Sequence, residues 1–313
     1  MPGEATVTQT AVPTTEAPPF RFFPVEVLRV ERLSPNFLRV TFTGDDLDRF
    51  AENGFDQRIK LIPPLEGSGF AHMPEGLDWY TQWRNLPDEQ RNPIRTYTVR
   101  GVRRHLREVD VDMVLHGVSG PASRWAVSAG PGSRALLMGP NADFPGTAGG
   151  IDFHPPVNTR RILLGGDETA APAIASILEH LPADAVGEAI IEVPEAADRL
   201  EISAPAGFRV TWLSRDGSVH GTGLIPAIEA AAQRLLGDCT KPVSADLEDI
   251  DVDHDILWEV PDGTETTIDG FYAWLAGEAA VIKTLRRHLV SGCGVDRRAV
   301  AFMGYWRLGK AEC

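Results

Sequence analysis

The sequence has few cysteines, no long apolar run and no excess of basic residues. Its three cysteines, Cys239, Cys293 and Cys313, form no CxxC pair, which argues against a disulfide framework and against zinc or iron–sulfur ligation. No apolar stretch reaches the roughly 18 residues that span a bilayer. The net charge of −14 argues against nucleic acid or an anionic membrane as the main partner. We therefore expect a cytoplasmic protein with free thiols.

Motifs of several common chemistries are also missing. The sequence has no GxxxxGK[ST] loop, no GxSxG elbow and no HExxH pair. An acidic run from Asp249 to Asp255 has the alternation of a calcium loop. His254 and Val260 stand where an EF-hand needs Gly and Glu, so a solvated acidic loop is the better interpretation. No set of protein ligands for a metal can be assembled from spacing.

Two patterns divide the chain. Residues 1–19 are rich in Thr, Pro and Ala without the cationic start of a signal peptide, so we expect a disordered tail. Short strand-like runs indicate an antiparallel β-barrel over 20–150, and alternating strands and helices indicate a parallel α/β sheet over 151–313. We expect barrel strands at 22–30, 37–43, 58–62, 96–102, 108–116 and 134–138, then sheet strands at 161–164, 188–193, 208–213, 271–275 and 299–305, with helices at 168–181, 224–236 and 278–290.

A long connection at 63–93 is rich in Pro, Gly and aromatic residues. Such a segment is usually a functional flap or a disordered insert. Trp79, Tyr80 and Trp83 favour a packed flap, because tryptophan and tyrosine bury large apolar rings.

One predicted strand carries the residue types that a flavin requires. In Arg95-Thr96-Tyr97-Thr98-Val99, odd and even positions lie on opposite faces. A flavin needs a cation for its phosphates, an aromatic ring beside its ring system and a small donor near N5. Arg95, Tyr97 and Thr98 supply these three types. An ordinary edge strand with a tyrosine in the core explains the segment equally well on its own.

A second motif favours the flavin. His116-Gly117 ends a predicted strand, and Gly120-Pro121-Ala122-Ser123 opens a short helix. Proline is tolerated in the first helical turn, and the free N–H groups there bind phosphate together with the helix dipole. Gly120 permits close approach of the backbone, and Ser123 can donate to a phosphate oxygen. A simple helix cap does not explain why this pattern follows the first one by a single strand.

Longer segments narrow the interpretation: RTYTVR, DMVLHG, GPASRWA, LLGGDETAAPAI, AWLAGE and GYWRLGKAE occur in this order. They resemble the siderophore-interacting protein family of the ferredoxin-reductase-like superfamily, whose members are FAD-dependent ferric-siderophore reductases. The resemblance runs from about Phe22 to Glu312. It implies an FAD-binding β-barrel domain followed by an α/β domain of the NAD(P)H-binding type. Where the superfamily often has Cys-Gly-Pro at the nicotinamide site, this chain has Ala276-Gly277-Glu278.

The resemblance also implies roles for single residues. Arg95 and Ser123 would bind the FAD phosphates, Tyr97 would lie against the flavin, and Trp306 would lie by the cofactor. Thr98 is the predicted catalytic residue, because its hydroxyl would form a hydrogen bond near N5. His116 and Gly117 would lie along the pyrophosphate and adenosine half, and Val99, Gly120, Pro121 and Ala122 complete the predicted FAD site.

The turn after the first strand of the second domain is a candidate site for the nicotinamide nucleotide. Its glycines precede a helix N-terminus, which can hold a phosphate. The turn is not a GxGxxG motif, and a helix N-cap with acidic residues in the first turn is the alternative. The predicted contacts are Gly166, Asp167, Glu168, Thr169 and Ala170.

An anionic ferric siderophore needs local cations in so acidic a chain. The candidates are Lys60, on a strand whose neighbours Ile59 and Leu61 point the other way, Arg307 and Lys310. Exposed, solubilising cations are the alternative. We expect the siderophore to bring its own iron.

These observations predict an oxidoreductase of iron acquisition: an FAD-dependent ferric-siderophore reductase that releases Fe(II), with electrons from NAD(P)H. A ferredoxin is an alternative donor. The rivals are a general NAD(P)H–flavin reductase serving another acceptor and a siderophore-binding protein without turnover. A carrier needs no redox cofactor, so the flavin motifs argue against it. We expect a monomer with neither nucleic acid nor membrane as partner.

Overall fold

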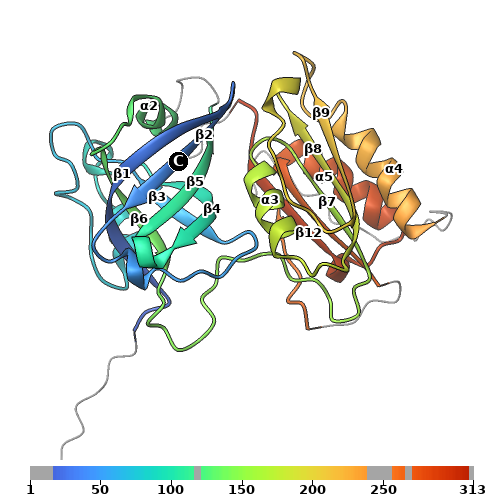
Figure 1. The fold of residues 1–313 in the computed structure, drawn as a ribbon, viewed down its shortest axis with the longest axis horizontal. Helices are drawn as coiled ribbons and strands as arrows, with labels where there is room; N and C mark the ends of the chain where they lie inside the picture. The colour runs from blue at the N-terminus through green and yellow to red at the C-terminus, as the bar shows by residue number, and fades with distance from the viewer. Residues whose placement is uncertain (1–16, 116–120, 238–255, 265–269, 310–313) are drawn as a thin grey trace, which may run out of the picture.

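The computed structural model describes residues 17–115, 121–237, 256–264 and 270–309, with only the backbone of residues 121–123. The described residues form two domains that lie side by side (Figure 1). No helix among them is long and apolar enough to cross a bilayer. The expected tail at 1–19 lies almost wholly outside the described residues.

The first domain is a closed antiparallel barrel with the strand order β1-β2-β5-β4-β3-β6. Its core follows from period-two patterning: Val25 and Val27 of β1 are buried while Glu26 between them is exposed. The predicted barrel is confirmed. The strands are β1 (Phe20–Ser34), β2 (Phe37–Thr43), β3 (Arg58–Ile62), β4 (Arg95–Arg103), β5 (Glu108–Val114) and β6 (Arg134–Pro140), and helix α2 (Pro121–Ser128) lies between β5 and β6.

The second domain is a mostly parallel sheet with the order β10-β12-β11-β7-β8-β9, in which only β10 pairs antiparallel among the described strands. Helix α3 packs on one face, and α4 and α5 pack on the other. The predicted α/β sheet is confirmed. The elements are β7 (Arg161–Gly166), α3 (Ala171–His180), β8 (Val186–Val193), β9 (Gly207–Ser214), α4 (Leu224–Leu236), β10 (Trp258–Glu259), β11 (Phe271–Glu278), α5 (Ala279–Arg287), a π-helical turn (His288–Gly292) and β12 (Val300–Trp306).

Two expected helix bounds differ from the structure. The helix expected from 168 begins at Ala171, because Asp167 and Thr169 form a turn before it. The helix expected to run to 290 is α-helical only to Arg287 and then widens into the π-helical turn. Strand β10 was not predicted, since two residues give no periodic pattern. The domain boundary near residue 150 stays a prediction.

The two domains share apolar and polar contacts. Phe37 of β2 is fully buried in the cluster that also holds α3 and one face of the second sheet. Beside it, the buried carboxylate of Asp198 accepts hydrogen bonds from Ser34 Oγ at 2.7 Å and from the backbone and side-chain nitrogens of Asn36 at 2.8 Å each. These contacts fix the β1–β2 turn against the segment that follows β8.

The 63–93 connection is a packed flap, as predicted. It contains the short helix α1 (Trp79–Arg84), and Trp83 is 8% exposed. Trp83 packs with Ile62 at the end of β3 and with Ile94 just before β4. Its indole nitrogen donates to the carbonyl of Asn92 at 2.9 Å. The flap therefore closes over one end of the β3–β4 strand pair.

Candidate functional site

Strand β4 presents two different faces. Tyr97 and Val99 pack into the barrel core, and burial raises the pKa of Tyr97 to about 12. Thr98 lies on the opposite face, directly across the strand pair from Arg58 of β3. The prediction that Tyr97 and Thr98 lie on opposite faces of the strand is confirmed. The core holds Tyr97 in place, and the Thr98 side chain lies on the outer face of the barrel.

Two side chains of β4 fit an FAD. The Arg95 guanidinium donates to the carbonyl of Ile94 at 2.8 Å, and within the described residues no carboxylate pairs with it. Arg39 and Arg103, by contrast, each form two hydrogen bonds to one aspartate. The Thr98 side chain, 6% exposed, has no hydrogen-bond partner in the described part of the chain. A partly buried cation without an acid suits a phosphate, and a hydroxyl without a partner suits a flavin ring atom.

The second part of the predicted FAD site falls at α2, which starts at Pro121 where the sequence predicts a helix. Trp125 of this helix stacks on Phe42 of the barrel at a centroid distance of 6.2 Å. The phosphate cradle stays a prediction. Pro121, Ala122 and Ser123 are described by backbone only, and His116, Gly117 and Gly120 lie outside the described residues.

The predicted substrate cation Lys60 lies on the outer face of β3. Its Nζ donates to Thr96 Oγ1 at 2.7 Å, across the register pair that joins the two residues. Ile59 and Leu61 are buried in the barrel core, so they point the other way, as predicted. Lys60 and Thr98 therefore share one face of the β3–β4 pair.

A buried polar cluster lies beside this face, between the two domains. Asp56 accepts hydrogen bonds from the backbone of Asp152 and from Trp274 Nε1, each at 3.1 Å. Burial raises the pKa of Asp56 to about 6. Arg58 lies 2.7 Å from the Asp152 carboxylate and 4.7 Å from the ring centre of Trp258. Arg58 was not predicted, although strand alternation places it on the same face as Lys60.

The order of the strands reverses at β7. The chain continues from β7 to β8 and β9 on one side, whereas β11 and β12 lie on the other side. Ligands of open α/β sheets bind beyond the strand ends at such a point. Asp167 accepts hydrogen bonds there from Thr169 Oγ1 at 2.5 Å and from Glu278 N and Trp306 Nε1 at 2.8 Å each. Burial, with the nearby charge of Glu168, raises the pKa of Asp167 to about 6. Asp167 thus ties the ends of β7, β11 and β12 together.

Glu168 is also engaged inside the protein. Its side chain is 1% exposed and accepts two hydrogen bonds from Arg215, at 2.5 and 2.7 Å. Burial would raise its pKa, but hydrogen bonds from His220 and Arg215 hold the pKa of Glu168 at about 2. The His220 ring lies 4.8 Å from the Trp306 ring in an edge-to-face contact. No motif marks Arg215 and His220, which only the fold brings to Glu168.

The remaining residues of the predicted nucleotide turn are small for packing reasons. A Cβ on Gly166 would lie 2.3 Å from the Ala276 carbonyl oxygen and 2.5 Å from the Ala170 Cβ. Ala170 is fully buried. A nucleotide at this edge would therefore meet backbone groups, Thr169 and Trp306 before it met either acid. The predicted nucleotide contacts stay predictions.

The predicted C-terminal cations follow β12. Arg307 is half-buried beside Trp306, and Lys310 lies outside the described residues. Within the part of the chain that the structure describes, no three His, Cys, Asp or Glu side chains are grouped closely enough to hold a metal ion.

Known proteins share both the sequence pattern and the fold of this chain. A family profile described as "Siderophore-interacting FAD-binding domain" matches residues 26–144, and one described as "Siderophore-interacting protein" matches residues 159–309. Ferric vibriobactin reductase ViuB of Vibrio cholerae is 31% identical over 288 residues, covering 92% of this chain and 90% of the relative. The NADPH-dependent ferric-chelate reductase of Escherichia coli is 28% identical and covers 91% and 93%. The crystal structure of the siderophore-interacting protein SipS from Aeromonas hydrophila matches with a TM-score of 0.66 at 28% identity, covering 94% of each chain.

Proposed function

The chain belongs to the siderophore-interacting protein family, and from this premise we propose that it is an FAD-dependent ferric-siderophore reductase. It takes electrons from NAD(P)H and releases iron as Fe(II). The observation that carries the proposal lies at the start of β4. Among the described residues Arg95 has no carboxylate partner and the Thr98 hydroxyl has no hydrogen-bond partner. Lys60 lies on the same face of the strand pair as Thr98.

The proposed reaction converts NAD(P)H and two ferric ions into NAD(P)⁺, two ferrous ions and one proton. Bound FAD would accept two electrons from NAD(P)H and pass them on one at a time. Iron is held by the siderophore as substrate. Hard oxygen ligands bind Fe(III) far better than Fe(II), so reduction loosens the chelate. The protein needs no nucleophile of its own for this reaction.

The proposed FAD site rests on charge and shape. Arg95 and Ser123 bind the phosphates, since a guanidinium forms short charge-assisted hydrogen bonds with phosphate oxygens. In this proposal Tyr97, which packs against the barrel core, lies against the flavin, and Thr98 offers its hydroxyl near N5. In the proposal His116 and Gly117 would lie along the pyrophosphate and adenosine half, and Gly120 would permit close approach of the backbone to a phosphate.

The proposed nucleotide site lies beyond β7, at the turn from Gly166 to Ala170. Support comes from the reversal of strand order at β7 and from the similarity to the NADPH-dependent ferric-chelate reductase of Escherichia coli. Trp306 is held by its hydrogen bond to Asp167, so it forms a fixed wall at this edge. Asp167 and Glu168, whose side chains are buried, also give the turn its shape.

The proposed substrate site uses Lys60 and Arg307. With a net charge of −14 the protein repels anions at long range, so an anionic chelate needs local cations. Lys60 meets this need two register pairs away from Thr98, on the same face of the strand pair. A monomer in the cytoplasm is part of the proposal, because the dispersed thiols suit a reducing compartment.

The colour of the purified protein tests this proposal. We expect a yellow protein whose flavin absorbance is bleached by NADPH or NADH under anaerobic conditions and restored by a ferric siderophore. Colourless protein that takes up no added FAD would reject the enzyme and favour a carrier. Bleached flavin that no ferric siderophore restores would favour a reductase serving another acceptor.

A further inference from the structure

Helix α3 connects the two proposed cofactor sites. It begins at Ala171, directly after the proposed nucleotide turn, and it ends at His180 against the barrel. Ten residues of α-helix span roughly 15 Å. Figure 1 shows α3 on the side of the second domain that faces the barrel. A rigid helix of this kind transmits the position of one end to the other.

The far end of α3 is bound to the flavin strand by an ion pair. Arg100 of β4 donates from Nη1 and Nη2 to the two carboxylate oxygens of Glu179, at 2.6 and 2.5 Å. The side chains are 12% and 26% exposed. Asp112 of β5 lies 3.5 Å from Arg100 Nε, within ion-pair distance on the barrel side. A two-pronged pair fixes angle as well as distance, and Arg100 follows Thr98 by two residues.

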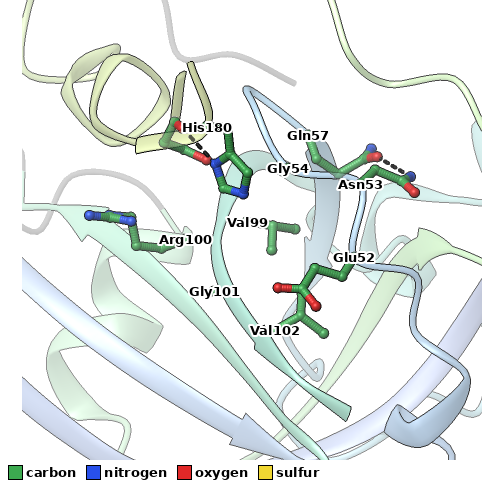
Figure 2. A pocket seen from close by; sticks show the side chains of 10 residues that line it. Glu52, Asn53, Gly54, Gln57, Val99, Arg100, Gly101, Val102 and His180 are labelled. Atoms are coloured by element: carbon green, nitrogen blue, oxygen red, sulfur yellow. Dashed lines mark hydrogen bonds between the residues drawn. The ribbon is translucent and has the colours of Figure 1, made fainter. Parts of the chain in front are cut away.

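The end of α3 makes a second contact with the barrel, through His180 next to Glu179. The His180 ring packs on Gly54, where a Cβ would lie 2.6 Å from the ring carbon Cδ2. His180 Nδ1 lies 2.7 Å from the Ser176 carbonyl oxygen, which orients the ring. Figure 2 shows His180 from α3 with Arg100 and Val99 from β4 around one pocket. The end of α3 is therefore seated in the barrel at a defined place.

The position of the Arg100–Glu179 ion pair suits a role in fixing the arrangement of the two domains. The domains are also bound through Asp198 at the β1–β2 turn and through Asp56 at Trp274. Phe37 of β2 and Arg58 of β3 also contact the second domain. Arg100–Glu179 is the ion pair that lies on the flavin strand itself.

We propose that Arg100 and Glu179 are positioning residues that set the distance and angle between the flavin strand and the nucleotide turn. The inference rests on the proposed function, since the pair aligns the nicotinamide with the flavin for hydride transfer. That transfer moves one hydride from the nicotinamide to FAD and leaves NAD(P)⁺. A misplacement of about 1 Å at such a step can cost about a hundredfold in rate. Neither residue touches the reacting atoms.

The first test measures domain geometry without activity. Spin labels are attached at Leu106→Cys on the barrel and at Val186→Cys on the second domain, both exposed sites. The native Cys239, Cys293 and Cys313 are changed to Ser. Double electron–electron resonance then measures the distribution of distances between the two labels. Arg100→Gln and Glu179→Gln should each broaden the distribution. Arg234→Gln is the matched control, because it breaks a two-pronged pair with Glu188 inside one domain.

The second test measures anaerobic flavin reduction by NADPH in a stopped-flow instrument. Arg100→Gln, Glu179→Gln and the double variant should each slow it about tenfold, with the double no slower than the singles, because the two residues act as one unit. Reduction by dithionite, the flavin potential and the rate of Arg234→Gln should stay at wild-type values. Single variants with wild-type distance distributions and NADPH rates would overturn the inference. Wild-type protein that NADPH never reduces would instead reject the proposed function.

Discussion

Replacing Arg215 by methionine should be strongly destabilising, because it leaves the Glu168 carboxylate buried without its cation. Arg215 and Glu168 are 8% and 1% exposed in their side chains and share two hydrogen bonds. Removing one partner of a buried pair costs about 3–5 kcal/mol in other proteins. The pKa of Glu168 leads to a similar figure. It falls from 4.5 to about 2 in the folded protein, through hydrogen bonds from His220 and Arg215 together, which corresponds to about 3 kcal/mol for the two partners at roughly 1.4 kcal/mol per pKa unit.

Urea unfolding measures this free energy. Arg215→Met should lose about 3 kcal/mol at pH 7, and the double variant Arg215→Met/Glu168→Gln should recover most of the loss because the buried charge of Glu168 is removed as well. Arg234→Met is the control, since Arg234 forms the same two-pronged pair with Glu188 but is 46% exposed. An exposed pair of that kind contributes at most about 1 kcal/mol.

The pH dependence gives an independent check. Because the folded pKa of Glu168 is lowered, its stabilisation is present above about pH 4.5 and is lost as the pH falls towards about 2. In Arg215→Met this dependence should shrink, because the hydrogen bond from His220 is left to lower the pKa of Glu168 without Arg215. A loss below about 1 kcal/mol, equal to that of Arg234→Met, would refute the reasoning about the buried pair.

Further variants test the separate parts of the site. Arg95→Ala should weaken FAD binding by tenfold or more in a fluorescence titration, since a hydrogen bond to a charged group contributes about 1.5–3 kcal/mol. Exposed Arg134→Ala, the control, should leave it unchanged. Lys60→Ala should raise the KM for an anionic ferric siderophore several-fold but not for a neutral one, with FAD affinity kept; equal effects on both would contradict the basic site. Burial raises the pKa of Asp56 from 3.8 to about 6, so its stabilisation is present below about pH 4 and is lost as the pH rises through about 6. Chemical unfolding of wild type relative to Asp56→Asn should show a loss of up to about 3 kcal/mol between pH 4 and 7, and a constant difference would contradict this pKa.

The elements of the fold were predictable where residues repeat with a clear period. The core face of β1 and the alternation of Ile59, Lys60 and Leu61 follow from local patterning, which one strand's own sequence determines. The two-residue strand β10 was not predictable, because it exists only through pairing with β12. Element ends also depend on tertiary contacts, as at Ala171, where the turn held by Asp167 delays the helix.

The candidate site was predictable only where the chain keeps its residues close together. Arg95, Tyr97 and Thr98 share one strand, so their faces follow from alternation. Arg215 reaches Glu168 across 47 positions, and Arg100 reaches Glu179 across 79. No spacing rule joins such pairs, because their contact depends on how the strands and domains are arranged.

The most direct test of the central claim is a count of ferrous iron. Protein reduced by NADPH without oxygen is mixed with excess ferric siderophore and a ferrous chelator, and Fe(II) and flavin absorbance are recorded together. The proposed function predicts two Fe(II) for each FAD reoxidised, at equal rates. Flavin that reoxidises without Fe(II), or that stays reduced in the presence of every ferric siderophore, would contradict the claim.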